Sequence, residues 1–227
     1  MSIAYLVGIG PGAVEYITLK AKSLIEESDI VVGYRHAIES IRPLIRDGKD
    51  VRVITLKTQD EVYNSLLKEL KCNELSCSIL FTGDVNFSES EIVDRLVELF
   101  SYNGIEVNLI PGISSIQVAA AYSNVPLDKA AILTFHVTGS IEDRKSRLIE
   151  ALKESRDIIL LPRPWDFMPY HIYRFIEDNG IDVSSYYVEI YENLTLKNES
   201  ITRCRLDKVG DRAYSDLCVM VLKHKKG

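Results

Sequence analysis

Short apolar runs alternate with amphipathic segments through the first half of the chain. Residues 3–9 form a nearly continuous apolar run closed by glycine and proline, which is typical of a buried strand in a parallel sheet. Similar strand-like runs cover residues 29–33, 51–56, 78–81 and 106–110. Apolar positions recur at helical spacing over residues 18–27, 61–70 and 89–100. This alternation predicts an α/β domain whose mostly parallel sheet carries helices on both faces.

The pattern begins again after Pro126 and then changes in kind. Strand-like runs cover residues 130–135 and 157–161, and helical spacing covers residues 141–153 and 167–179. Three more strand-like runs, at residues 186–191, 201–205 and 217–222, have no long helix between them, so we expect antiparallel pairing there. The sequence therefore predicts an N-terminal α/β domain over residues 1–125 and a C-terminal α+β domain with a mixed sheet over residues 126–227.

Composition narrows the class of protein. With 46% hydrophobic and 26% charged residues, the 227-residue chain matches an ordinary globular protein. No segment approaches the roughly 18 apolar residues of a membrane span, and a net charge of −6 argues against a general nucleic-acid binder. The first residues carry no basic leader, so we expect a cytoplasmic protein with neither a membrane nor a nucleic acid as partner. The cysteines and histidines lack the spacing of zinc ligands, and we expect no metal site.

A glycine-rich loop, Gly8-Ile9-Gly10-Pro11-Gly12, follows the first predicted strand. Such a loop lets a ligand approach the backbone closely. It departs from a dinucleotide-binding fingerprint, because Ala13 stands where the third glycine is expected and Pro11 removes a backbone donor. A tight turn between strand and helix is the alternative interpretation of this loop.

Three further loops also follow predicted strands, at residues 82–87, 111–115 and 160–164. In open α/β sheets ligands bind outside the carboxyl ends of the strands, where such loops collect. We therefore predict one composite cleft that is bounded by both domains. In these loops Asp84 is the strongest candidate for a ligand-binding residue. Its alternative interpretation is a turn or helix-capping residue.

Taken together, these motifs resemble those of the tetrapyrrole (corrin/porphyrin) methylases, a family of S-adenosylmethionine-dependent enzymes, over nearly the whole chain. The motifs that carry the resemblance are Val7-Gly8-Ile9-Gly10-Pro11-Gly12, Thr82-Gly83-Asp84, Ile110-Pro111-Gly112-Ile113-Ser114-Ser115, and Tyr191-Glu192-Asn193-Leu194-Thr195 with Glu199. Val85 and Asn86 depart from the family pattern, in which proline usually follows the Gly-Asp pair. Within the family, residues 28–35 and 111–117 most resemble the branch that methylates C5 of a precorrin, whose substrate in the anaerobic route is cobalt-precorrin-7.

The resemblance implies a fold and a reaction. The fold is the two-domain tetrapyrrole methylase fold, with the active-site cleft between the domains. The reaction is methyl transfer from S-adenosylmethionine to carbon, in cobalamin biosynthesis, with the electron-rich macrocycle as nucleophile. No side chain is assigned as a general base, although Tyr34 and His36 follow the second predicted strand. The family also implies a homodimer, and a separate C15-methyltransferase and decarboxylase that acts next, since no second catalytic domain precedes Gly227.

The resemblance also implies which residues bind the cofactor. They lie in the loops after the predicted strands, and for Leu161 and Leu194 core packing is an equally good interpretation. The implied cofactor-binding residues are Ile9, Gly83, Asp84, Phe87, Gly112, Ser114, Ser115, Leu161, Leu194 and Thr195.

A precorrin carries several acetate and propionate groups, so an acidic protein must gather positive charge locally to bind it. Arginine suits this task, because its planar guanidinium pairs with both oxygens of a carboxylate. Arg35 and Arg163 are the candidates, each with a solvated surface role as the alternative, and Gly10, Pro11 and Gly12 are expected beside the macrocycle.

Two other functions remain open from the sequence. One is another branch of the same superfamily, which acts at a different ring carbon or, as in diphthamide synthesis, on a modified protein histidine. The other is a protein that binds adenosyl ligands without turnover. Binding of S-adenosylmethionine alone does not separate these functions, whereas the position of a transferred methyl group does.

Overall fold

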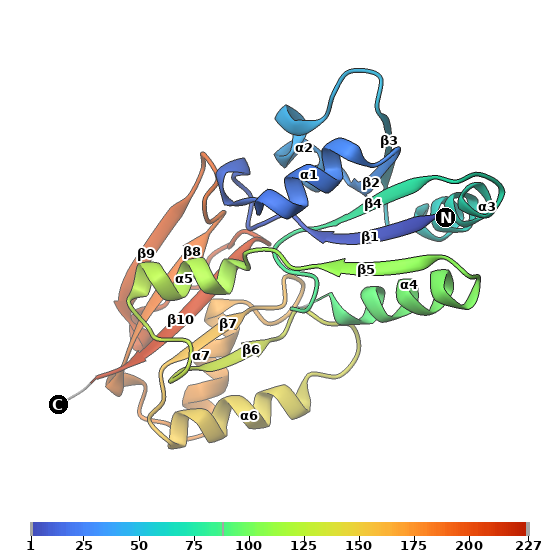
Figure 1. Cartoon of the computed structure of the whole chain (residues 1–227). Coiled ribbons are helices and arrows are strands. Elements are labelled where there is room, and N and C mark those ends of the chain that lie inside the picture. Colours follow the sequence, from blue (N-terminus) through green and yellow to red (C-terminus); the bar gives the residue numbers. More distant parts are fainter. Residues whose placement is uncertain (1, 88, 226–227) are drawn as a thin grey trace. The chain divides into compact units, whose positions relative to one another are not determined.

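The computed structural model describes residues 2–87 and 89–225, and the chain divides into two compact units, Met1–Ser114 and Ser115–Gly227 (Figure 1). The sequence predicted a division after Val125. The difference is one helix, Ser115–Ser123, which packs on the strands of the second unit rather than on those of the first. Within the described ranges, no helix combines the length and the apolar character needed to cross a membrane.

The first unit is built around a five-stranded parallel sheet with the strand order β3-β2-β4-β1-β5. Its N-terminal strand, β1, lies between β4 and β5 because its residues are apolar on both faces. The elements are β1 (Ile3–Gly8), η1 (Val14–Tyr16), α1 (Leu19–Glu27), β2 (Ile30–Tyr34), α2 (Arg35–Ser40), η2 (Arg42–Leu44), β3 (Asp50–Ile54), α3 (Gln59–Cys72), β4 (Ser76–Phe81), α4 (Ser90–Tyr102) and β5 (Glu106–Ile110).

Both faces of this sheet are covered, as the sequence predicted. Alternate strand residues such as Leu6 and Ile79 pack with α3 and α4, while Val7 and Leu80 pack with α1 and α2 on the other face. Figure 1 shows α1 and α4 on opposite sides of the strands. Parallel strands covered in this way all point their carboxyl ends to one edge, where the loops of interest begin.

The second unit has a mixed five-stranded sheet with the order β6-β7-β10-β8-β9. Only β6 and β7 pair in parallel, and β10 runs antiparallel to both β7 and β8, which confirms the antiparallel pairing expected for the last strands. The elements are α5 (Ser115–Ser123), β6 (Ala131–Thr134), α6 (Glu142–Lys153), β7 (Ile158–Leu161), α7 (Pro169–Asp178), η3 (Val183–Ser185), β8 (Tyr186–Glu192), β9 (Ser200–Arg205), η4 (Leu206–Lys208) and β10 (Cys218–His224).

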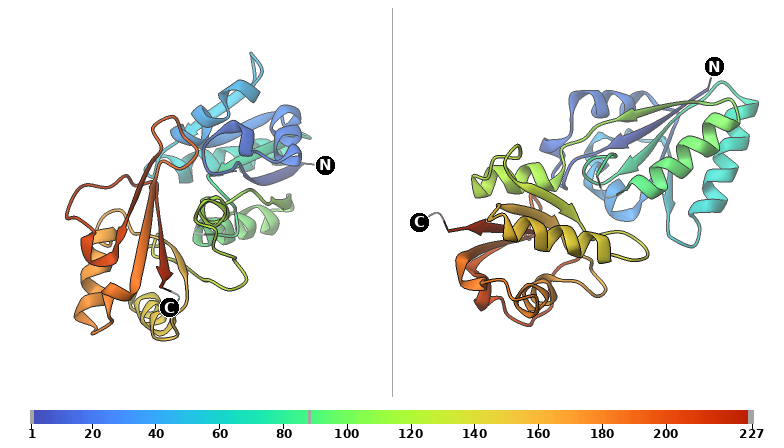
Figure 2. Two further views of the ribbon diagram at one scale, coloured as in Figure 1. Left: turned by 90° about the vertical axis from the view of Figure 1, so that its left-hand side faces the viewer. Right: turned by 90° about the horizontal axis from the view of Figure 1, so that it is seen from below.

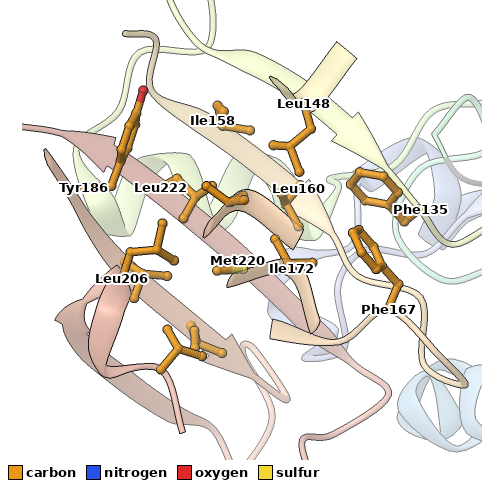
Figure 3. Close-up of a cluster of buried hydrophobic side chains, with 14 of the residues drawn as sticks. Phe135, Leu148, Ile158, Leu160, Phe167, Ile172, Tyr186, Leu206, Met220 and Leu222 are labelled. Carbon is orange, nitrogen blue, oxygen red and sulfur yellow. The ribbon is translucent and has the colours of Figure 1, made fainter. Parts of the chain in front are cut away.

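The main core of the second unit lies on one face of its sheet (Figure 3). Leu160 and Met220 of the central strands pack there with Leu148 of α6 and Ile172 of α7, and all four are fully buried. The other face of the sheet is covered by α5, which contacts β7 and β10 (Figure 2). Both faces of the sheet are thus covered by helices, although its three C-terminal strands are antiparallel.

A buried glutamate fixes the C-terminal end of α5. Glu189 of β8 accepts hydrogen bonds from Tyr191 Oη at 2.6 Å, Arg203 Nε at 3.0 Å and Lys223 Nζ at 2.9 Å. Lys223 Nζ also donates to the carbonyl oxygen of Ser123, the last residue of α5, at 2.9 Å. Burial alone would raise the pKa of Glu189, but these three donors hold it below its usual value. The network ties α5 to the end of β10.

We expect Glu189→Gln to destabilise the protein at neutral pH. The neutral amide leaves Lys223 and Arg203 without their carboxylate partner, which costs about 1.5–3 kcal/mol for hydrogen bonds to charged groups. A carboxyl with a depressed folded-state pKa stabilises the fold above its unfolded pKa of roughly 4.3, and this stabilisation is lost as the pH falls through the folded-state value. Urea unfolding should therefore separate wild type from variant most at pH 7, and the difference should shrink as the pH falls below about 4. Exposed Glu150→Gln is the control, and an equal loss in both variants would contradict the expectation.

Candidate functional site

The loops after β1 and β4 are hydrogen-bonded side by side at the carboxyl edge of the first sheet. Ile9 N donates to the carbonyl of Phe81 at 2.9 Å. Gly10 and Gly83 then exchange two backbone hydrogen bonds, of 3.2 and 2.7 Å. Ile9, Gly10, Pro11 and Gly83 are buried in this contact, and Gly12 is half-buried. The structure therefore brings two of the predicted site loops together.

The loop after β5 joins them through a close approach of three backbones. A Cβ atom added to Gly112 would lie 2.2 Å from the carbonyl oxygen of Gly83 and 2.6 Å from the carbonyl carbon of Gly8. A Cβ on Gly8 would likewise lie 2.6 Å from Gly112 N. Only residues without a side chain fit at these two positions, so the glycines of two separate motifs are explained by one contact. Gly83 has a φ of 76°, and this conformation favours glycine there.

We expect Gly112→Ala to lower the thermal stability of the protein markedly. The added methyl group forces the three backbones apart, and overpacking of this kind costs about 1–3 kcal/mol. Gly210→Ala is the matched control, because a Cβ at Gly210 would meet nothing within 4 Å. Thermal unfolding of the two variants measures the difference, and equal melting temperatures would show that the contact does not constrain the loops.

Asp84 joins the loops after β4 and β5 through a hydrogen bond. Its Oδ2 accepts a hydrogen bond from Gly112 N at 2.8 Å, and its Oδ1 accepts one from Asn86 N at 2.8 Å. The second bond is the turn role that the sequence left open, and the first is a non-local contact that the sequence did not indicate. Phe87, which closes the turn with a backbone bond from its N to Asp84 O at 3.2 Å, is half-buried.

The segment after β2 contributes a histidine and an arginine to the same edge. His36 Nε2 lies 3.0 Å from Thr82 Oγ1, directly before Gly83. The ring of His36 also stacks on Tyr34, with 6.0 Å between the centroids. Partial burial lowers the pKa of His36, and the field of Glu39 offsets this only in part, so the neutral imidazole is favoured. Arg35 begins α2 and is exposed, as a side chain that receives a substrate carboxylate must be.

The remaining predicted cofactor residues of the first half lie where the two units join in sequence. Ser114 is buried, with 8% of its surface exposed, and ends the first unit. Ser115 is half-buried and is the first residue of α5 in the second unit. Because the Lys223 contact fixes the opposite end of α5 at the end of β10, Ser115 lies toward the edge where β10 begins.

The predicted residues of the second half share one edge of the second sheet. This edge is formed by the carboxyl ends of β6, β7 and β8 and by the start of the antiparallel strand β10. Leu161 is the last residue of β7 and is half-buried, whereas Leu194, after β8, is only 4% exposed. Thr195 has a φ of 71°, and its backbone N donates to Glu199 Oε2 at 2.6 Å. Glu199 therefore supports the loop in which Leu194 and Thr195 lie.

Arg163 has internal partners that the sequence did not reveal. Its Nε and Nη2 donate to the two carboxylate oxygens of Asp166 at 2.5 and 2.7 Å, and its Nη1 donates to Gly139 O at 2.8 Å. Only 9% of the residue is exposed. A substrate carboxylate would have to compete with Asp166 for this guanidinium, so the contacts differ from those that a carboxylate clamp needs. Arg35 keeps the exposure that this role requires.

Two aromatic side chains at this edge were missed by the sequence analysis. His136 follows β6, and Trp165 lies in the loop after β7, with 6.1 Å between their ring centroids. Both positions follow the predicted strands at residues 130–135 and 157–161, which is the signal that could have identified them.

Comparison with known proteins identifies the family. The model of the tetrapyrrole (corrin/porphyrin) methylases matches residues 4–210. The chain belongs to this family. A probable cobalt-precorrin-7 C(5)-methyltransferase from Methanocaldococcus jannaschii is 33% identical over 217 residues, which cover 95% of this chain and 96% of the relative.

Solved structures confirm the tetrapyrrole methylase fold. The precorrin-6Y methylase of Archaeoglobus fulgidus has a TM-score of 0.70 and 23% identity, and the comparison covers 99% of each chain. The uroporphyrin-III C-methyltransferase of Thermus thermophilus, in complex with S-adenosylhomocysteine, also has a TM-score of 0.70, with 20% identity over 97% of this chain and 92% of that one. The family is S-adenosylmethionine-dependent, so the predicted enzyme class, a C-methyltransferase, and the predicted cofactor are confirmed.

In each unit, taken separately, the predicted cofactor-binding residues have a chemistry that suits that cofactor. At the first edge, the nearest atom that a Cβ on Gly83 would meet is Ser114 Cα, at 3.8 Å, so the backbone of Gly83 is not covered. At the second edge, Leu161 and Leu194 supply apolar surface. The ten cofactor-binding candidates include one carboxylate, that of Asp84, and no cationic side chain, which agrees with the positive charge of a sulfonium ion.

We expect Asp84→Ala to weaken binding of S-adenosylhomocysteine by about tenfold or more, since Gly112 N loses its partner and an unpaired backbone donor away from water costs roughly 1–3 kcal/mol. The alanine releases Gly112 N and lets the loops after β4 and β5 separate. Asp84→Asn, which keeps one acceptor oxygen, should lose less. Titration calorimetry measures both, with Asp94→Ala on the exposed face of α4 as the control. Unchanged affinity in the alanine variant would remove Asp84 from the site.

Proposed function

We propose that the protein transfers a methyl group from S-adenosylmethionine to C5 of a precorrin, cobalt-precorrin-7, in cobalamin biosynthesis. The observation that carries this proposal is the 33% identity to the Methanocaldococcus jannaschii relative, which extends over nearly the whole of both chains. The segments that most resemble the C5 branch are residues 28–35 and 111–117. In the structure these segments contain Arg35, which directly follows β2, and Gly112, which follows β5, and both residues lie at the carboxyl edge of the first sheet.

The bound cofactor supplies an activated methyl group on a sulfonium leaving group. The task of the protein is therefore to hold two ligands in line rather than to form a covalent intermediate, and good orientation of two reactants is worth about 7–11 kcal/mol. A rigid frame suits this task. Asp84, Gly112 and Gly83 provide one through the non-local bond and the close backbone approach described above.

We assign cofactor binding to both edges. At the first edge the residues are Ile9, Gly83, Asp84, Phe87, Gly112 and Ser114, and at the second edge they are Ser115, Leu161, Leu194 and Thr195. Gly10, Pro11 and Gly12 then contact the macrocycle, and Arg35 pairs with one of its carboxylates. Arg35 suits this role because it is exposed at the start of α2, beside the segment that also carries His36.

Turnover with cobalt-precorrin-7 tests the proposal. With S-adenosylmethionine carrying a ¹³C-labelled methyl group, we expect a product that has gained one methyl, and carbon NMR should place the label at C5. A label at another ring carbon would assign the protein to a different branch of the family. Tight binding of S-adenosylhomocysteine without transfer to any tetrapyrrole would contradict the enzymatic proposal as a whole.

A further inference from the structure

Trp165 is the only tryptophan of the chain, and 59% of its surface is exposed. It lies near the tip of a tight loop after β7. The base of this loop is closed by two backbone hydrogen bonds between Arg163 and Phe167, of 3.1 and 3.0 Å. Phe167 is buried and packs edge-to-face on Phe135, with 4.8 Å between the centroids, so the core anchors the loop (Figure 3).

The ring of Trp165 is supported from two directions. The guanidinium of Arg163 lies 5.6 Å from the ring centroid. That guanidinium is itself fixed by the bidentate pair with Asp166 and by the bond to Gly139 O. The ring of His136 meets Trp165 edge-on, at an interplanar angle of 78°. The tryptophan is therefore held in place by its neighbours while much of its surface remains exposed.

A large aromatic side chain that is exposed but held in place is suited to bind a flat ligand. The entropy cost of ordering the side chain has been met in folding, so more of the stacking energy appears as affinity. The loop also follows Leu161 directly, at the edge that carries Leu194 and Thr195, where cofactor binding is assigned. A ligand that reacts with the cofactor must bind beside these residues.

We propose that Trp165 stacks against the macrocycle of the tetrapyrrole substrate and that Arg163 is a positioning residue for this ring. The proposal rests on the proposed function for the class of ligand, a flat conjugated ring with carboxylates at its rim. The proposal explains why Arg163 has internal contacts. The guanidinium lies over the Trp165 ring and supports it instead of pairing with a substrate carboxylate, and Asp166 balances its charge.

Binding of uroporphyrin III, a flat tetrapyrrole with eight carboxylates, tests the proposal without turnover. We expect Trp165→Ala to weaken its binding by about tenfold or more, as for the loss of one aromatic stacking partner, and Trp165→Phe to stay within about threefold of wild type. The affinity is read from the absorbance of the porphyrin. Binding of S-adenosylhomocysteine, measured by calorimetry, should be unchanged in both variants and shows that they are folded. Tyr102→Ala, which removes an aromatic side chain that is 93% exposed on α4, is the matched control.

The single tryptophan gives a second readout for Arg163. In Arg163→Lys the planar support is lost while the positive charge remains. We expect Trp165 fluorescence to become less anisotropic and more accessible to acrylamide, and uroporphyrin affinity to fall severalfold. In wild type, bound uroporphyrin should protect Trp165 from acrylamide.

Three results would overturn the proposal. They are equal uroporphyrin affinity in wild type and Trp165→Ala, no protection of Trp165 by the porphyrin, and no uroporphyrin binding by a wild type that binds S-adenosylhomocysteine. Each of these leaves the methyltransferase function intact. That function fails separately, if the wild type binds no S-adenosylhomocysteine or transfers no methyl group.

Discussion

The close approach of three backbones at the carboxyl edge of the first sheet is the constraint on which the candidate site depends. Gly8 and Gly112 leave no room for a side chain where they meet the backbone of Gly83, and Asp84 bonds across the contact to Gly112 N. These loops come from strands that are far apart in sequence but adjacent in the sheet, since β1 lies between β4 and β5. The sheet order thus determines which motifs meet, and the glycines determine how closely.

In the second unit, charged side chains rather than glycines hold elements in position. Its last three strands are antiparallel, so the position of α5 on the sheet depends on specific contacts in addition to apolar packing. Lys223 supplies one, because it bonds both to the buried Glu189 and to the end of α5. At the opposite edge, the pair of Arg163 with Asp166 fixes the loop that carries Trp165. In both places an ion pair positions an element that the proposed function uses.

Most of the fold could be predicted from the hydrophobic pattern, and the failures have physical causes. Continuous apolar runs such as β1 and β2 were predicted to within a residue or two at each end, because strands buried on both faces have a strong signal. The helix α5 was missed because Ile116, Val118 and Ala119 are all buried and the segment has no polar stripe to show helical spacing. The division of the chain was then placed at the next proline, beyond this helix.

Prediction of the candidate site from the sequence also had a limit, because contacts between distant residues are not visible in the sequence. The sequence indicated that Asp84 and Gly112 lie in site loops, but their hydrogen bond joins residues 28 positions apart and depends on the strand order and on the close approach of the loops. By contrast, Arg163 and Asp166 are three residues apart, so their pairing could have been anticipated from local spacing. Because the sequence analysis did not consider the pairing with Asp166, it predicted that Arg163 contacts substrate carboxylates.

The central claim is the proposed assignment of adenosyl-cofactor binding to the loops at the carboxyl edge of the first sheet and, separately, to those at the corresponding edge of the second. Amide hydrogen exchange of the wild-type protein, with and without S-adenosylhomocysteine, tests it most directly. The account predicts slower exchange on binding in residues 9–12, 83–87 and 112–115 of the first set of loops, and in residues 161–163 and 193–196 of the second. Slower exchange in only one of the two sets, or chiefly outside both, would contradict it.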